Sequence, residues 1–340
     1  MRNVALIELN SYHGECLYSQ LRYLKASECT VILFCDKRQE SSVSEFAHLA
    51  DEVCFWDMKK LSVLLRLRKI LIERNVETVV FNTLHGGRVL KLMLMPFPKR
   101  MSFYGTIHNI RKMSDSFGQR LICRRVKGVY VLAEYLKPTF KKLSALPCEA
   151  YSSSLTMEKH VDSRNVKPDD VIWAVIPGSI EYKRRDYDKL LELANRTSDS
   201  VKFILLGNSR KGDGQDFISR IAPELREKRF VIFDKFVDND TFESYITQAD
   251  YLLPLITEGT PIADDYMYYK ISGTFILAKT YGVPMLLHES FGRLNDFDYP
   301  AEYYTTEEEL LKLMHEHHQQ TDKQTDFEIE RRKYVAMLFG

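Results

Sequence analysis

Short runs of apolar and β-branched residues recur along the chain, each bounded by turn-forming residues. Runs of this length are typical of strands buried in a parallel sheet. Segments with helical periodicity separate most of them, for example LSVLLRLRKILIERN at residues 61–75. In the first half, the predicted strands lie at residues 3–9, 30–36, 52–57, 78–83, 101–108 and 128–134.

The same rhythm restarts after about residue 165. Five more strands are predicted at residues 171–178, 201–207, 230–236, 251–256 and 284–289. Strands that alternate with helices predict a parallel sheet with right-handed crossovers. Two such units predict an α/β protein with two Rossmann-like domains, and the length of 340 residues suits two domains. The polar segment Ser152–Asp170 is the predicted linker.

Basic residues are concentrated in the first half of the chain. Residues 1–150 hold 24 Lys and Arg against 14 Asp and Glu, a net charge of +10, and the remainder carries −9. This asymmetry indicates two domains with different partners. A basic domain suits an anionic surface or a phosphate-bearing substrate, although charges scattered over solvated faces would give the same count.

Several classes of protein are disfavoured by composition. The apolar runs are too short and too interrupted to span a bilayer. The N-terminus enters a strand-like run directly, without the pattern of a signal peptide. The six cysteines form no C-x-x-C pair, as expected of buried thiols in a reducing cytosol. We therefore expect a cytoplasmic protein.

Ionisable and glycine residues follow the predicted strands of the first half. NSYHGE after the first strand carries His13, Gly14 and Glu15, NTLHGG after the fourth carries His85, and GTIHNIRK after the fifth carries His108. Ligands of open parallel sheets bind beyond the carboxyl ends of the strands, so these side chains are candidate site residues. His108 is the candidate proton acceptor, with a histidine held by the backbone as the alternative.

The second half has its own candidate site. PGSIEYKRRDY places Gly178, Arg184 and Arg185 after its first strand. Arginine binds phosphate oxygens in a bidentate manner. Neither G-x-G-x-x-G nor a P-loop motif follows a strand, which disfavours a dinucleotide or P-loop site.

A triplet of small residues, Ser272, Gly273 and Thr274, precedes an apolar helical run. Ser272 is a good N-cap residue. The same triplet could instead hold an anion, because backbone N–H groups at a helix start attract phosphate. Both interpretations remain open at the level of sequence.

The second half resembles the donor domain of GT-B glycosyltransferases, especially the retaining family 4 (group 1) type. The resemblance covers about residues 171–290. It rests on the order and spacing of motifs that are individually weak. These are Gly178 with its basic residues, Leu205–Gly207, Phe233–Val237, QADYLLPL, Pro254 with Glu258-Gly259, and Ala278, Gly282 and Pro284.

The resemblance implies a metal-independent enzyme that moves a sugar from a nucleotide-sugar donor to a glycan or lipid-linked glycan, as in polysaccharide biosynthesis, without a cofactor. It implies that Glu258 contacts sugar hydroxyls and that His108 and His13 serve catalysis. The acceptor side would be formed by Glu15, Gly14 and His85. The donor nucleotide and diphosphate would be held by Gly178, Arg184, Arg185, Val237, Ser272, Gly273 and Thr274.

The implied domains are residues 1–160 for the acceptor, 165–322 for the donor, and a C-terminal helix at 323–340 that packs back on the first domain. The chain departs from the family where Leu277 occupies the place of a second glutamate, and where roughly eleven extra residues follow Glu258. A nucleotide-sugar epimerase or hydrolase, or a non-catalytic GT-B-like binding protein, therefore remains an alternative.

Two acidic or histidine-rich stretches are not interpreted as metal sites. DND at residues 238–240 precedes a helix, where acidic residues cap. HEHH at residues 315–318 lies on a polar helix without the converging ligands of a zinc site. The chain has no recognisable nucleic-acid-binding module. The basic first half is the predicted site of any peripheral contact with a membrane.

Overall fold

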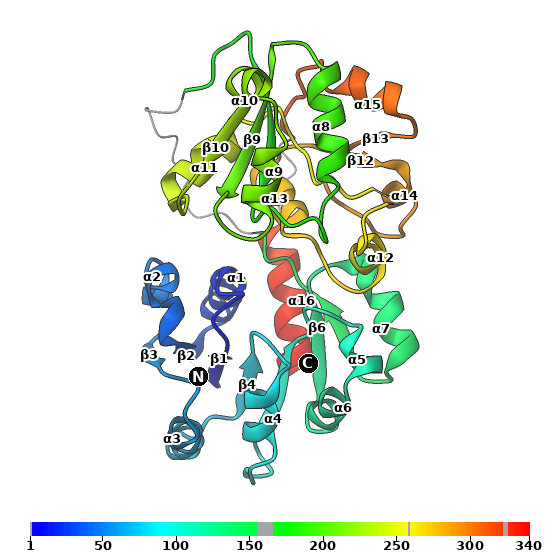
Figure 1. The fold of residues 1–340 in the computed structure, drawn as a ribbon. Helices are drawn as coiled ribbons and strands as arrows, with labels where there is room; N and C mark the ends of the chain where they lie inside the picture. Colours follow the sequence, from blue (N-terminus) through cyan, green and yellow to red (C-terminus); the bar gives the residue numbers. More distant parts are fainter. Residues whose placement is uncertain (1, 155–165, 258, 322–325) are drawn as a thin grey trace. The chain divides into compact units, whose positions relative to one another are not determined.

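A computed structural model of the chain describes residues 2–154, 166–257, 259–321 and 326–340. It divides into two compact units, each a parallel sheet covered by helices (Figure 1). The first unit comprises Met1–Leu155, Tyr268–Ile271 and Asp326–Gly340. The second comprises Thr156–Met267 and Ser272–Thr325.

The first sheet has seven parallel strands in the order β3-β2-β1-β4-β5-β6-β7. Its strands are β1 (Arg2–Glu8), β2 (Cys29–Asp36), β3 (Glu52–Trp56), β4 (Thr78–Phe81), β5 (Ser102–Thr106), β6 (Gly128–Val131) and β7 (Cys148–Ala150). The helices of this unit are α1 (Glu15–Lys25), α2 (Glu40–Val43), α3 (Leu61–Glu73), α4 (Gly87–Met93), α5 (Lys112–Asp115), α6 (Phe117–Cys123), α7 (Lys137–Leu143) and α16 (Phe327–Phe339).

The second sheet has six parallel strands in the order β10-β9-β8-β11-β12-β13. Its strands are β8 (Ile172–Pro177), β9 (Val201–Asn208), β10 (Phe230–Phe233), β11 (Tyr251–Leu252), β12 (Met285–His288) and β13 (Ala301–Tyr304). The helices formed by this part of the chain are α8 (Tyr187–Arg196), α9 (Gly214–Ser219), α10 (Pro223–Arg229), α11 (Asn239–Thr247), α12 (Ala263–Tyr268), α13 (Gly273–Tyr281), α14 (Glu289–Gly292) and α15 (Glu307–Leu313).

The two sheets repeat one topology. In each, the chain builds three strands outward from the centre, returns, and adds the remaining strands on the other side. This is the strand order of a Rossmann-like fold, so the predicted α/β class with two such domains is confirmed. All eleven predicted strands are present, and the sequence missed only the edge strands β7 and β13.

The order of each sheet reverses at one point, between β1 and β4 in the first unit and between β8 and β11 in the second. At such a point the helices that follow the two central strands cover opposite faces of the sheet. Loops at the carboxyl ends then diverge and leave room for a ligand. The two candidate sites below begin at these positions.

Helix α16 is part of the first unit, although some 170 residues separate it from the rest. It packs on α1 and β7. Its Tyr334 is fully buried, and the ring stacks on Tyr130 with 4.6 Å between centroids. The Tyr130 hydroxyl donates to the Tyr334 carbonyl at 2.5 Å, and Tyr23 and Tyr151 complete the aromatic cluster.

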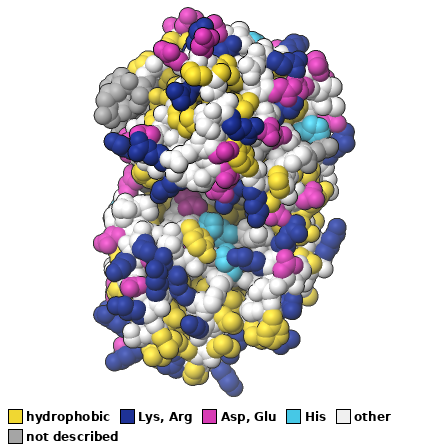
Figure 2. Space-filling model, in the orientation of Figure 1, with side chains coloured by type: hydrophobic (Ala, Val, Ile, Leu, Met, Phe, Trp, Pro, Cys, Tyr) yellow, Lys and Arg dark blue, Asp and Glu magenta, His cyan; other side chains and the backbone are white. Residues whose placement is uncertain are grey.

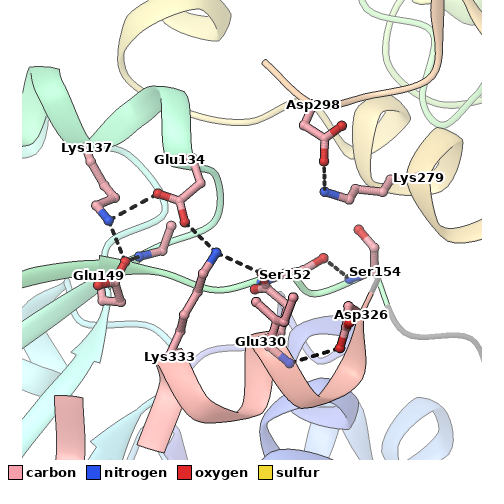
Figure 3. A network of polar contacts seen from close by, with 12 residues as sticks. Glu134, Lys137, Glu149, Ser152, Ser154, Lys279, Asp298, Asp326, Glu330 and Lys333 are labelled. Atoms are coloured by element: carbon pink, nitrogen blue, oxygen red, sulfur yellow. Dashed lines mark hydrogen bonds and ion pairs between the residues drawn. The ribbon is translucent and has the colours of Figure 1, made fainter. Parts of the chain in front are cut away.

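A polar network also holds α16 to the first unit (Figure 3). Lys333 Nζ lies 2.9 Å from Glu134 Oε1 and 3.2 Å from Glu330 Oε1. The second oxygen of Glu330 accepts the Ser152 N–H at 2.7 Å. Lys137 extends the network from Glu134 to another carboxylate on β7. The helix is therefore fixed by charge at one end and by aromatic packing along its length.

One short segment, Tyr268–Ile271, also groups with the first unit, whereas the sequence pattern places it in the second domain. The Tyr269 carbonyl accepts the Ile110 N–H at 2.8 Å, and the Arg111 guanidinium lies 4.4 Å from the centre of the Tyr269 ring. Tyr135 donates its hydroxyl to the carbonyl of Lys270 at 3.4 Å. The segment belongs to the extra residues that follow Glu258.

Candidate functional site

A buried carboxylate marks the carboxyl end of β1. Glu8 is fully buried and accepts hydrogen bonds from the Asn10 N–H at 2.6 Å, Asn82 Nδ2 at 2.7 Å and the Thr83 hydroxyl at 2.5 Å. Burial raises the pKa of Glu8, and the hydrogen bonds from Thr83, Asn10 and Asn82 counteract part of that rise. Glu8 thus ties the loop after β1 to the loop after β4.

The hydrogen-bond network continues from this carboxylate to the C-terminal helix. Gln20 Nε2 donates to Asn82 Oδ1 at 2.5 Å, and the Tyr334 hydroxyl donates to Gln20 Oε1 at 3.0 Å. Asn82 Nδ2 also donates to the carbonyl of His13 at 2.7 Å. This bond helps to hold His13 in a left-handed conformation, with φ of 68°, that non-glycine residues rarely adopt.

Three histidines predicted from separate loops come together beside this network. The rings of His13 and His108 stack with centroids 3.8 Å apart and planes 9° apart. His85 meets His108 edge-on at 6.2 Å. Figure 2 shows histidine side chains gathered on this face of the first unit, with Lys and Arg side chains around them. The sequence thus identified residues that the fold clusters.

The hydrogen bond of His108 fixes which of its nitrogens carries the proton. His108 Nε2 lies 2.8 Å from the Asn82 carbonyl oxygen, which can only accept, so Nε2–H is the donor. Burial, together with the neighbouring His13, His85 and Lys112, lowers the pKa of His108 well below its usual value. The ring is neutral at pH 7, and Nδ1 carries the lone pair that can accept a proton.

His85 is the most enclosed of the three, with 5% of its surface exposed. Burial, Lys112 and His13 lower its pKa to about 3, so it is also neutral at pH 7. Its Nδ1 is buried and has no hydrogen-bond partner among the residues that the structure describes. Such an atom in a native protein calls for an explanation, and a ligand is one.

Gly14 and Glu15 complete the first loop. Glu15 is exposed, and its Oε1 lies 3.3 Å from His13 Nδ1. A Cβ on Gly14 would collide with Gln39 Oε1, so a larger residue here would require the Gln39 side chain to move. Gln39 in turn donates to the Asn10 carbonyl at 2.7 Å and so shapes the loop.

The second candidate site begins at Gly178, which follows β8 with φ of 95°. Arg185 reaches back to this turn: Nη2 donates to the Pro177 carbonyl at 2.5 Å and lies 3.3 Å from Thr274 Oγ1. Its other terminal nitrogen, Nη1, is buried and has no partner among the described residues. A guanidinium N–H that is withdrawn from water and unpaired is available for an anion.

Arg184 and Arg185 differ, although the sequence treats them as a pair. The Arg184 side chain is 56% exposed, and its Nε lies 2.9 Å from Glu181 Oε2 in a surface ion pair. Arg185 alone points toward Gly178 and Thr274. A sequence cannot distinguish two adjacent arginines in a turn.

Ser272 is the N-cap of α13, since its hydroxyl accepts the Thr274 N–H at 3.3 Å. The cap interpretation of the triplet is therefore confirmed. It leaves room for the second interpretation, because Gly273 is exposed and an added Cβ would meet no atom within 4 Å. Within the described part of the chain, the Gly273 N–H has no acceptor.

Two other candidates flank this turn. Val237 lies buried after β10, next to Asp238, the N-cap of α11. Glu258 lies outside the described residues. The preceding residue, Thr257, donates its hydroxyl to Asp186 Oδ2 at 2.9 Å, while the Asp186 N–H donates to the Leu255 carbonyl at 2.8 Å. Asp186 thus holds the loop that leads to Glu258.

Solved structures share this architecture along nearly the whole chain. Alr3699/HepE from Anabaena, in complex with UDP-glucose, is 12% identical with a TM-score of 0.62, over 99% of this chain and 97% of its own. A putative UDP-N-acetylglucosamine 2-epimerase from Listeria monocytogenes is 12% identical with a TM-score of 0.58, over 99% and 95%. The E. coli ADP-heptose LPS heptosyltransferase II is 12% identical with a TM-score of 0.50, over 99% and 98%. The chain has the GT-B fold.

No protein-family model and no curated protein sequence matches the chain. At 12% identity the similarity establishes the GT-B fold and leaves the reaction open. In this GT-B protein each candidate site lies beyond the switch point of its own sheet.

Sequence reasoning missed Glu8, Asn82 and Asp186. The one available signal was a carboxylate at the end of an otherwise apolar strand, which is unusual for a buried position.

Proposed function

We propose that this GT-B protein is a glycosyltransferase that moves a sugar from a nucleotide-sugar donor to a hydroxyl of a glycan or lipid-linked glycan, without a metal ion. The observation that carries the proposal is the buried, unpartnered Nη1 of Arg185 beside Gly178 and Thr274. A guanidinium, a turn without Cβ and a helix start are together suited to a diphosphate. Structures with the same fold contain UDP, UDP-glucose and glucose.

The chemistry assigned to this site is stabilisation of the leaving group. When the bond between the anomeric carbon and the diphosphate oxygen breaks, negative charge develops on the diphosphate. Arg185 and the exposed N–H of Gly273 would stabilise that charge, because preorganised donors act most strongly where charge develops. Val237 would lie on the nucleotide side, and Arg184 would contribute only through its positive charge at the surface.

The first unit would supply the proton acceptor. The acceptor hydroxyl oxygen forms a bond to the anomeric carbon, the diphosphate departs, and the hydroxyl proton passes to Nδ1 of His108. The lowered pKa of His108 keeps that nitrogen unprotonated at pH 7, at the expense of basic strength. His13, Glu15 and His85 would contact the acceptor, and Glu258 would bind sugar hydroxyls.

A nucleotide-sugar epimerase or hydrolase is the second candidate. The observation in its favour is that the putative UDP-N-acetylglucosamine 2-epimerase from Listeria monocytogenes shares the fold, with a TM-score of 0.58 at 12% identity. A cluster of neutral histidines also suits proton transfer at a sugar carbon. An epimerase or hydrolase would consume the donor without an acceptor, and a binding protein would not consume it at all.

The proposal is tested by titration calorimetry with UDP, ADP and GDP. We expect one of them to bind. Arg185→Ala should weaken its binding by about 1–3 kcal/mol, the scale of a hydrogen bond to a charged group. Arg184→Ala is the matched control, because it removes the same charge from a side chain paired with Glu181. Equal losses from both variants, or no binding of any nucleotide, would remove the diphosphate site.

A further inference from the structure

The first unit has an open hollow at the edge of its sheet opposite to the candidate site. Its volume is about 600 Å³, within the range of small-molecule sites. It is lined by Arg2 at the start of β1, by the turn between α1 and β2 at residues 26–28, and by α16 from Arg331 onward. Elsewhere in the described residues, no group of side chains could hold a metal ion and no helix could cross a bilayer. The hollow thus joins the two ends of the chain within one unit.

Apolar side chains form the part of the hollow that belongs to α16. Val335, Ala336 and Phe339 all line it, and their spacing of three or four residues places them on one face of the helix. The Phe339 ring is only partly buried, and the Arg2 guanidinium lies 4.2 Å from the centre of that ring. The hollow therefore presents apolar surface directly beside a positive charge.

Three guanidinium groups line the hollow, and only one of them has an acidic partner. Arg331 donates to Glu328 Oε2 from Nε at 3.1 Å and from Nη2 at 2.7 Å. Its Nη1 donates to the Ser27 hydroxyl at 3.0 Å. Arg331 is thus held in place with two of its five N–H groups left over. Arg2 and Arg332 are exposed and form no ion pair with any described residue.

Acidic side chains do not balance this charge. Glu28 is the one acidic side chain among the described residues that line the hollow, and it is exposed without an ion pair in that part of the chain. With Glu328 counted against Arg331, two guanidinium groups face one carboxylate. The excess charge of the hollow is therefore positive, which favours an anion as its occupant.

We propose that this hollow binds a small organic anion, a phosphate or a carboxylate joined to an apolar group. Guanidinium groups bind both kinds of anion through paired N–H donors. The N–H groups left on Arg331 already have a fixed direction, so little freedom is lost when they bind. The apolar part of the ligand would pack on Val335 and Phe339. The proposal is independent of the reaction proposed above, because the hollow lies at the amino ends of β1 and β2.

A bound anion would join α16 to the start of the first sheet. It would contact Arg2 on β1 together with Arg331 and Arg332 on α16. A ligand that binds only the folded protein raises the free energy of unfolding of the part that binds it. Trp56 on β3 belongs to this unit, so its fluorescence reports the effect.

The test is urea unfolding of the full chain in a Trp173→Phe background, followed through Trp56 at constant ionic strength. The probes are phenyl phosphate and benzoate. Inorganic phosphate and benzyl alcohol are matched controls, because each carries only one half of the proposed chemistry. We expect phenyl phosphate or benzoate to raise the urea midpoint more than either control does, and the more effective probe identifies the anion as phosphate or carboxylate.

Variants assign the effect to the hollow. Arg2→Gln with Arg332→Gln should weaken binding of the effective probe about tenfold or more, the scale of lost hydrogen bonds to a charged group. Lys141→Gln with Lys142→Gln is the control of equal charge, because both lysines are exposed at the end of α7. Ala336→Phe adds a ring to a residue that lines the hollow, keeps every charge, and should also weaken binding.

Two results would overturn the proposal. One is that neither phenyl phosphate nor benzoate raises the midpoint of the parent above the controls. The other is that the arginine and lysine double variants respond equally to the probes, which would place any bound anion elsewhere in the first unit.

Discussion

The neutral, buried His85 should make the first unit sensitive to acid. In the folded protein its pKa lies at about 3, against 6.5 in the unfolded chain. Its contribution to stability is therefore fully present above pH 6.5 and is lost as the pH falls toward 3. At about pH 5 the unfolded chain binds a proton that the folded protein does not, and 1.36 kcal/mol per pH unit gives a loss of about 2 kcal/mol.

The perturbation is His85→Asn, which removes the titrating group and keeps a polar side chain. The free energy of unfolding of the variant should fall by about 2 kcal/mol less than that of the parent between about pH 8 and about pH 5. His48→Asn is the matched control, because His48 lies exposed in the same unit. The comparison uses the change in the free energy of unfolding between the two pH values. Any pH-independent effect of the substitution on stability therefore cancels.

The chain offers a reporter for each unit in its two tryptophans, Trp56 on β3 and Trp173 on β8. Urea unfolding in a Trp173→Phe background, followed by fluorescence, reports the first unit through Trp56. The linear extrapolation gives the free energy of unfolding at each pH. If His85→Asn and His48→Asn kept the full pH dependence of the parent, His85 would not be held neutral by the fold.

Two further predictions concern the candidate sites. Gly273→Val should abolish nucleotide binding in a folded protein, because the valine side chain would fill the space that is empty around Gly273. Ser272→Ala should instead lower the free energy of unfolding by about 0.5–2 kcal/mol, because the helix loses its cap. Melting temperatures and nucleotide titrations on both variants check this, and normal affinity in Gly273→Val would refute a phosphate at the helix start. His108→Ala should reduce turnover by about 10²–10⁴-fold and leave nucleotide affinity unchanged. The rate of the wild-type protein should fall only at a pH well below 6.5, since the pKa of His108 is lowered. A near-normal rate of the variant in steady-state assays would leave His108 with a structural role.

The fold was predictable because central strands of a parallel sheet must be apolar along their whole length. Runs such as that of β1 signal their structure without any tertiary information. The two missed strands lie at sheet edges: β7 has three residues, and β13 is AEYY with no fully buried position. Edge strands need no apolar run, so their pattern does not distinguish them from loops.

The candidate sites were predictable as positions and not as contacts. The rule that ligands bind beyond strand ends selected His13 and His108, which the fold then stacks. The direction of each side chain could not be predicted, because the sequence does not distinguish the adjacent residues Arg184 and Arg185. Hydrogen bonds between residues far apart along the chain could not be predicted either. The hydroxyl of Tyr334 donates to Gln20, a residue 314 positions away.

The position of α16 has a consequence for how the protein is made on the ribosome. The first unit lacks the ring that fills its aromatic cluster until Tyr334 has been synthesised. Roughly 170 residues separate Leu155 from Asp326, and at about 5–20 residues per second their synthesis takes on the order of 10–30 s. For that interval the nascent first sheet lacks the ring that packs on Tyr130 and Tyr151. Completion of the first sheet is thus delayed until α16 has been synthesised.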